Sequence, residues 1–340
     1  KGWYSVSDEA YYNEDEVIEK DGKKISTISG SVVEWVEEES FFFKLSSFQE
    51  KLLEFYNNNP KFILPNSRKN EVVSFVQRGL KDLSVSRKSF TWGIKVPNNK
   101  KHIIYVWLDA LTNYLSALNY PNDKDDLFKN FWPATLHIIG KDILRFHAIY
   151  WPAFLLAADI KPPNRVYGHG WILSDKEKMS KSKGNILDPI DLIDGVSLEE
   201  LIAKRTEGLM QPKLKEKIIK QTNKQFPDGI EGYGTDALRY TYYSLASPGR
   251  NINFDIGRIK GYRNFCNKIW NAFRFIEMQA TNHDYQSRNG SSDILSDWMG
   301  SKIQHTSENC KAHIKNYRFD LASEEIYELV WSNFCDWYIE

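Results

Sequence analysis

Strands and helices alternate between residues 101 and 173, and this alternation constrains the fold more than any other feature of the chain. A buried strand is expected at 101–110, because five apolar or aromatic residues run from Ile103 to Trp107. Two more apolar strands are expected at 134–140 and 164–173, with helices between the strands. This order predicts an α/β fold with a parallel sheet, which binds ligands where its strands end.

The sequence on either side of this segment has a different character. Apolar residues spaced by three and four, from Ile259 through Cys266 to Phe273, predict a long amphipathic helix, and further helices are expected near 292–316 and 319–340. Four regions are therefore predicted: a small β-containing module at 1–44, the α/β segment at 45–185, a charged helical region at 186–254 and an α-helical bundle at 255–340.

The composition limits the classes of function. The 340 residues suit two or three domains, and the 45 basic and 45 acidic residues balance, which argues against a globally basic nucleic-acid binder. A local basic patch is still expected at 201–225, where seven Lys or Arg stand against two Glu. The widely separated Cys266, Cys310 and Cys335 favour a reducing, cytoplasmic location over a zinc knuckle or disulfide framework. No apolar stretch is long enough to predict a membrane span.

A lysine loop, "DKEKMSKSKGN" at residues 175–185, is the strongest candidate for chemistry. Lysine carries a mobile point charge that can follow a polyphosphate as its charge shifts during reaction. The small residues beside the lysines leave room for phosphate oxygens. A solvated turn is the alternative for a generic loop of this composition. The candidate catalytic residues are Lys178, Ser180, Lys181 and Ser182.

Two strand ends supply candidate nucleotide contacts. A glycine at the end of a strand lets the backbone approach a nucleotide, and a carboxylate just beyond it can reach ribose hydroxyls. Gly140 and Asp142 fit this pattern. His169 and Gly170, in "YGHG", are expected either to contact adenosine or to allow close packing.

The loop contains K-M-S-K-S, and the chain resembles the class I aminoacyl-tRNA synthetases, which carry that signature. Stretches such as "GWYSVSDEAYY", "YVWLDALTNYL" and "GKDILRFHAIYWPAFL" make residues 1–175 similar to methionyl-tRNA synthetase. From residue 175 onward, stretches such as "IKGYRNFCNKIWNAFRF" and "YRFDLASEEIYELVWSNFCDWYIE" resemble valyl-tRNA synthetase. The expectation is a chimera-like fragment joined near the lysine loop.

The resemblance implies a fold and a set of sites. It implies the C-terminal half of a Rossmann-like catalytic domain, followed by a stem-contact region and a truncated anticodon-binding bundle. ATP with Mg²⁺ would be used, with Lys178 and Lys181 stabilising pyrophosphate charge, and no protein-bound zinc is expected. Apolar and aromatic side chains suit a thioether, although each of them could also be ordinary core. The implied amino-acid pocket is Trp107, Ala110, Leu111, Tyr114, Ile143, Phe146 and His147.

Transfer RNA is the implied macromolecular partner. Basic and amide side chains of the helical half would contact its phosphates, although a basic helix face is more often only solvated. The candidates are Lys204, Arg205, Arg263, Asn267 and Lys268.

Two departures from the family pattern bear on function. No H-x-G-H motif occurs, so the chain is expected to be an incomplete piece of a longer enzyme; it begins at Lys1 and not at Met. Methionine is the favoured amino acid, because the pocket residues lie in the methionine-type half, and valine is the alternative. A non-catalytic tRNA-binding module and a nucleotidyltransferase of the same superfold are the other candidates.

Overall fold

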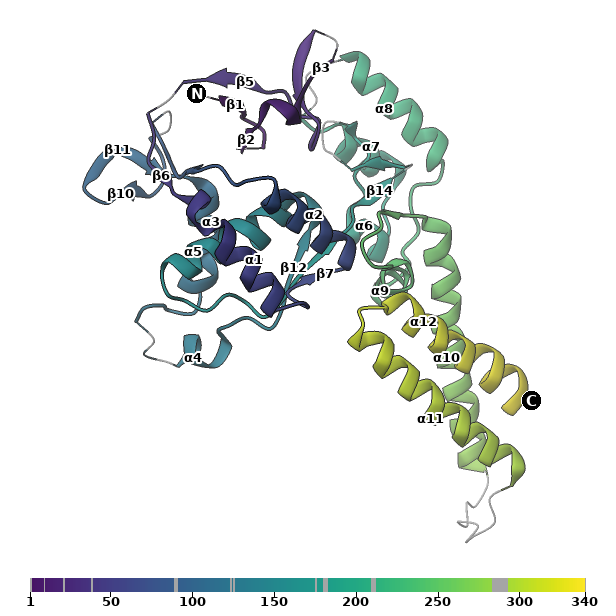
Figure 1. Ribbon diagram of the computed structural model, residues 1–340. Coiled ribbons are helices and arrows are strands. Elements are labelled where there is room, and N and C mark those ends of the chain that lie inside the picture. Colours follow the sequence, from purple (N-terminus) through teal and green to yellow (C-terminus); the bar gives the residue numbers. More distant parts are fainter. Residues whose placement is uncertain are drawn as a thin grey trace. The chain divides into compact units, whose positions relative to one another are not determined.

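The protein is described by a computed structural model that covers residues 2–8, 10–20, 22–37, 39–88, 91–122, 124, 126–174, 176–179, 183–208, 212–282 and 293–339. The chain divides into two compact units, Lys1–His169 and Gly170–Glu340 (Figure 1). The division falls inside the region 45–185 that was predicted as one segment. The four-part domain organisation stays a prediction.

A three-stranded parallel sheet organises the first unit. Its strand order is β12-β13-β7, and both strand pairs are parallel. Gly140 at the end of one strand pairs with His169 at the end of its neighbour, so the two strands finish together. The two-residue strand β7 was not foreseen, because so short a run carries no periodicity. The strands are β7 (Ile63–Leu64), β12 (His137–Gly140) and β13 (Val166–His169).

The strand predicted at 101–110 is wrong in its second half. Strand β11 (Asn99–Ile104) stops early and lies in a separate antiparallel sheet, between β10 (Lys95–Val96) and β9 (Ser86–Arg87). Helix α3 (Val106–Ser116) begins two residues later. An acidic residue in its first turn, Asp109, favours a helix N-terminus. Trp107 therefore lies on a helix and not at a strand end.

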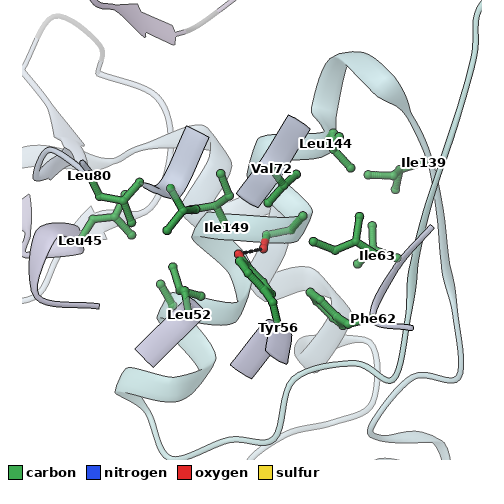
Figure 2. Close-up of a cluster of buried hydrophobic side chains, with 14 residues drawn as sticks. Leu45, Leu52, Tyr56, Phe62, Ile63, Val72, Leu80, Ile139, Leu144 and Ile149 are labelled. Atoms are coloured by element: carbon green, nitrogen blue, oxygen red, sulfur yellow. Dashed lines mark hydrogen bonds between the residues drawn. The ribbon is translucent and has the colours of Figure 1, made fainter. Parts of the chain in front are cut away.

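Helices pack around the parallel sheet and build the main core of the first unit (Figure 2). Val72 and Val76 lie four residues apart and are both buried, as expected for one face of a helix. The Tyr56 hydroxyl donates to the Ala148 carbonyl oxygen at 2.6 Å, so this buried polar group is satisfied. The helices are α1 (Gln49–Asn58), α2 (Asn66–Gln77), the 3-10 turn η3 (Lys141–Ile143), the π-helix η4 (Phe146–Tyr150) and α5 (Trp151–Ala157).

The predicted strand-rich character of residues 1–44 is confirmed. A three-stranded antiparallel sheet has the order β2-β1-β5, and β3 and β4 form a hairpin. The smaller elements of the unit are β1 (Gly2–Ser5), β2 (Ala10–Tyr12), η1 (Glu14–Glu16), β3 (Val17–Lys20), β4 (Lys23–Ser26), β5 (Glu34–Val36), β6 (Phe42–Phe43), η2 (Leu45–Phe48), β8 (Leu83–Ser84) and α4 (Leu127–Phe131).

The second unit begins with a small sheet that carries the lysine loop. Strand β14 lies between β15, antiparallel to it, and β16, parallel to it. The segment predicted as one strand at 164–173 is thus divided, since β13 belongs to the first unit and β14 to the second. The elements are β14 (Ile172–Ser174), β15 (Glu177–Lys178), α6 (Pro189–Asp194), α7 (Leu198–Thr206), α8 (Pro212–Gln225), α9 (Thr235–Leu245) and β16 (Ile252–Asn253).

The predicted helical bundle is confirmed in the rest of the second unit (Figure 1). Helix α10 contributes the buried Ile259 and Phe265, and α12 contributes Ala322. Residues 283–292, between the long helix and the next one, lie outside the described residues. The helices are α10 (Ile256–Asn282), α11 (Ile294–Lys315), α12 (Phe319–Glu328) and the π-helix η6 (Leu329–Tyr338). Among the described residues, no helix combines the length and apolar character needed to span a membrane.

Candidate active site

Gly140, Asp142 and His169 come together where β12 and β13 end. A methyl group built on Gly140 would lie 2.5 Å from Oδ1 of Asp142 and 4.0 Å from Cε1 of His169. Glycine therefore leaves room for the carboxylate, which lies exposed on the turn η3. A carboxylate beside an open backbone can accept hydrogen bonds from paired hydroxyls.

An aromatic wall forms where α3 faces η4, and we call it the pocket wall: Trp107, Leu111, Tyr114, Phe146 and His147. Trp107, Leu111 and Tyr114 are spaced by four and three residues, so α3 presents them on one face. The rings of Trp107 and Phe146 stack at 3.7 Å and 11°. Leu111 is buried in the same cluster. Stacked rings beside a leucine offer the polarizable surface that suits a thioether.

Tyr114 and His147 form the polar part of the pocket wall. Nδ1 of His147 lies 3.0 Å from the Ile143 carbonyl oxygen, to which it donates, and Nε2 lies 3.0 Å from the Tyr114 hydroxyl. In a neutral ring Nε2 must then accept the Tyr114 proton. Burial lowers the pKa of His147 and raises the pKa of Tyr114, so both groups are uncharged at neutral pH.

The remaining predicted pocket residues are Ile143 and Ala110. Ile143 is half-buried and contributes through its carbonyl bond to His147. Ala110 is exposed on α3, one residue from Leu111.

His137, the first residue of β12, lies beside the pocket wall and was missed by the sequence analysis. Its ring lies 4.3 Å from that of Tyr114. Burial, with a smaller contribution from nearby His147, lowers its pKa to about 4. A histidine in an otherwise apolar strand is a feature that could have identified it.

The lysine loop lies in the second unit, and Ser180, Lys181 and Ser182 are outside the described residues. Lys178, on β15, has its ammonium 4.4 Å above the Trp171 ring, within the range of a cation–π contact. Lys183 pairs with Glu177 at 2.8 Å and lowers the pKa of that carboxyl. The described ends of the loop are therefore held by specific contacts.

Gly170 has a packing role in this unit. A methyl group at this position would overlap the carbonyl oxygen of Arg250. This observation favours close packing, one of the two alternatives that the sequence left open for this glycine.

The structure contradicts one of the predicted tRNA contacts. Arg205 is 7% exposed; its guanidinium donates to the Thr222 hydroxyl at 3.2 Å and lies 4.9 Å from the Phe226 ring. A phosphate could not reach this group without opening the core. Arg205 is therefore a structural residue of the packing between α7 and α8.

The other predicted tRNA contacts remain accessible. Lys204 pairs with Asp191, which raises the pKa of the lysine. Arg263 pairs with Glu231 at 3.4 Å, and Lys268 pairs with Asp336 at 2.6 Å. Asn267 is exposed on α10.

No metal-binding group is found in the described part of the chain. None of its His, Cys, Asp and Glu residues form a cluster of three or more that could hold an ion.

Comparisons with known proteins assign the class. The profile of the family described as "tRNA synthetases class I (M)" matches residues 2–202, and that of the "Anticodon-binding domain of tRNA ligase" matches residues 296–340. The fold and the site thus define a class I aminoacyl-tRNA synthetase. Because the first profile matches more than half of the chain, the protein belongs to the class I tRNA synthetases of the M family.

Relatives and solved structures agree with this assignment. Methionine–tRNA ligases of Rickettsia typhi and Brucella suis are 58% and 57% identical over 201 residues, 59% of this chain and 39% of theirs. The structure of Mycobacterium tuberculosis methionyl-tRNA synthetase in complex with methionyl-adenylate has a TM-score of 0.79 and 37% identity, over 97% of this chain and 58% of that one. The chain thus spans under two thirds of the relatives it matches.

The comparisons do not support the expected junction near residue 175. The M-family match continues through the lysine loop to residue 202. The methionyl-tRNA synthetase structure aligns with nearly the whole chain.

Proposed function

We propose that the whole protein is a methionine–tRNA ligase, which activates methionine with ATP and transfers it to tRNA. The stacked Trp107–Phe146 pair beside the hydrogen-bonded Tyr114–His147 pair carries this proposal. The aromatic faces fit an unbranched thioether chain, and the uncharged polar pair avoids burying a charge beside it. The methionine ligases that match 59% of the chain support the same amino acid.

Each part of the site has a role in this proposal. Asp142 would accept hydrogen bonds from the ribose hydroxyls of ATP, beside the open backbone at Gly140. Lys178 and Lys181 would stabilise charge on the departing pyrophosphate. Mg²⁺ would be bound by the phosphate oxygens of ATP. The tRNA would be contacted in the helical unit, by Lys204, Arg263, Asn267 and Lys268. Charging of tRNA for translation would take place in the cytoplasm.

The test is amino-acid-dependent exchange of pyrophosphate into ATP by the full-length protein. Methionine is expected to support exchange and valine is not. Trp107→Ala should raise KM for methionine at least about fivefold, since an aromatic face is worth about 1 kcal/mol or more. Trp92→Ala is the control, because Trp92 is 90% exposed. Exchange with valine alone would overturn the proposal.

The alternative expected from the sequence is a valine-type origin of residues 175–340. A valine-type helical half would bind valine tRNA in preference to methionine tRNA. The M-family match through residue 202 and the anticodon-domain match to residues 296–340 support a helical half that serves the methionine enzyme. Filter binding of the full-length protein to the two purified tRNAs compares them directly. Preference for valine tRNA would support the valine-type origin.

A further inference from the structure

The buried histidine beside the pocket wall has no role in the function proposed above. His137 is 5% exposed and begins β12, where Ile138 and Ile139 follow it. Its backbone N–H donates to the Arg165 carbonyl oxygen at 2.9 Å, which fixes the residue within the parallel sheet. The side chain is therefore held by rigid secondary structure and not by a loop.

The imidazole of His137 packs against the ring of Tyr114. The two rings are 4.3 Å apart and tilted by 41°, the closest ring contact that either of them makes among the described residues. His147, the hydrogen-bond partner of Tyr114, has its ring 6.1 Å from His137. Trp132 lies at 6.3 Å. Because the two rings are in direct contact, a movement of the His137 ring would also move the Tyr114 ring and its hydroxyl.

Simple space filling does not account for an imidazole here. Nδ1 of His137 is buried and has no hydrogen-bond partner among the described residues. An unmet buried polar atom costs on the order of 1–3 kcal/mol. A phenylalanine would fill similar space without that cost, so the histidine is expected to contribute something other than stability.

We infer that His137 is a positioning residue: it holds the Tyr114 ring so that the Tyr114–His147 hydrogen bond faces the bound amino acid. This inference rests on the proposed function. His137 remains neutral near pH 7, because burial lowers its pKa to about 4, so it adds no charge beside the uncharged pair. It acts on the substrate only through Tyr114.

The test separates KM for methionine from KM for ATP in pyrophosphate exchange by the full-length protein. His137→Ala should raise KM for methionine about tenfold and change KM for ATP less than about twofold, since only the amino-acid wall is disturbed. In a Tyr114→Phe background the same substitution should add less than about twofold, because the hydroxyl is already absent.

A matched control is available in the same unit. His102 is equally buried, but its Nδ1 lies 3.0 Å from the Ser86 hydroxyl and its ring packs against Phe41. His102→Ala should leave KM for methionine unchanged. If His137→Ala does not fold, the comparison is made with His137→Gln, which should raise KM for methionine.

The outcomes distinguish the inference from the function on which it rests. If the unsubstituted protein does not activate methionine, the proposed function fails and the inference fails with it. If it does activate methionine, and the effects of His137→Ala and Tyr114→Phe multiply independently, the inference alone is wrong. The same holds if His137→Ala, or His137→Gln in its place, leaves KM for methionine unchanged.

Discussion

Lys204 and Arg205 are adjacent in the sequence and have opposite environments on helix α7. Lys204 is exposed, whereas Arg205 lies on the buried face four residues after Leu201, which is also buried. Both residues were predicted to contact tRNA because the segment is rich in basic residues. The helical period would have distinguished them, because residues four apart share a face of the helix. The pocket wall, in contrast, was found because the family resemblance named its members. His137 was missed because its segment was classified by its apolar residues, and the one histidine among them was not considered separately.

His137 should make the stability of the protein depend on pH. Its pKa is about 4 in the folded chain, against an ordinary value of 6.5. Between these values the unfolded chain binds a proton that the folded chain does not, so the free energy of unfolding falls as the pH decreases from 6.5 to 4. This group should contribute a loss of about 2 kcal/mol between pH 7 and pH 5.

Urea unfolding at the two pH values measures this contribution. His147 changes stability in the same direction, since burial also lowers its pKa. The difference between the unsubstituted protein and His137→Phe isolates the single group. An equal pH dependence in the two proteins would contradict the prediction.

Helices were predicted better than strands at the scale of the element. The periodicity of α10, α11 and α12 located each helix, because many residues share the pattern. The apolar run from Ile103 to Trp107 was ambiguous, since a short run fits a strand and a buried helix equally. Here β11 ends at Ile104 and α3 takes the rest. Which strands share a sheet depends on contacts distant in sequence, which no local pattern encodes.

Gly170 should be essential for the pairing of β14 with β16. A side chain at this position would meet the backbone carbonyl of Arg250, which cannot move without shifting β16. Gly170→Ala should destabilise the second unit by about 2 kcal/mol or more, measured as a lower thermal midpoint. Gly300→Ala is the control: nothing lies near that position, and alanine should stabilise helix α11 by about 0.5–1 kcal/mol. A harmless Gly170→Ala would refute the close packing.

Helix α8 presents exposed lysines on one face, which makes it a better candidate for phosphate binding than α7. Lys217, Lys220 and Lys224 are exposed and spaced by three and four residues, while Ile218 and Thr222 are buried. Replacing these three lysines with glutamine should weaken tRNA binding and lower the slope of log K against log salt by on the order of two. The assay is filter binding at several salt concentrations.

The control for this experiment makes the same change of charge elsewhere. Lys95, Lys100 and Lys101 are exposed in the first unit. Their replacement with glutamine should leave the salt slope unchanged. Equal slopes for the two triple variants would show that α8 makes no specific phosphate contacts.

The whole molecule combines two compact units, Lys1–His169 and Gly170–Glu340. The M-family profile matches residues 2–202 and the anticodon-domain profile matches residues 296–340, while the solved structure aligns with 97% of the chain. The net charge of the whole chain did not predict where basic residues gather, because the 45 basic and 45 acidic residues balance although one helix is locally basic. Composition averages over the surface, whereas recognition depends on where the charges lie.

The apolar surface of α10 should affect the behaviour of the whole chain in solution. Trp270 and Phe273 are more than half exposed and their rings lie 5.9 Å apart, with Ile269 and Ile276 also exposed. Adjoining apolar side chains favour self-association. Light scattering of the 340-residue chain should therefore rise with concentration, and Trp270→Asn with Phe273→Asn should reduce it.

Trp92→Asn is the matched control, because that tryptophan is exposed in the first unit. It should leave the scattering unchanged. A 340-residue chain that remains monomeric at all concentrations would contradict the prediction.

The π-helix η4 limits how this protein can change in length. Its wide turn contains an extra residue, and Phe146 and His147 lie on it. Deleting one residue there would give a regular helix without the wide turn, and would change which side chains of the turn face α3. Loops can gain or lose residues during evolution, but this turn should keep its length in every enzyme that pairs a tyrosine with a histidine in the same way.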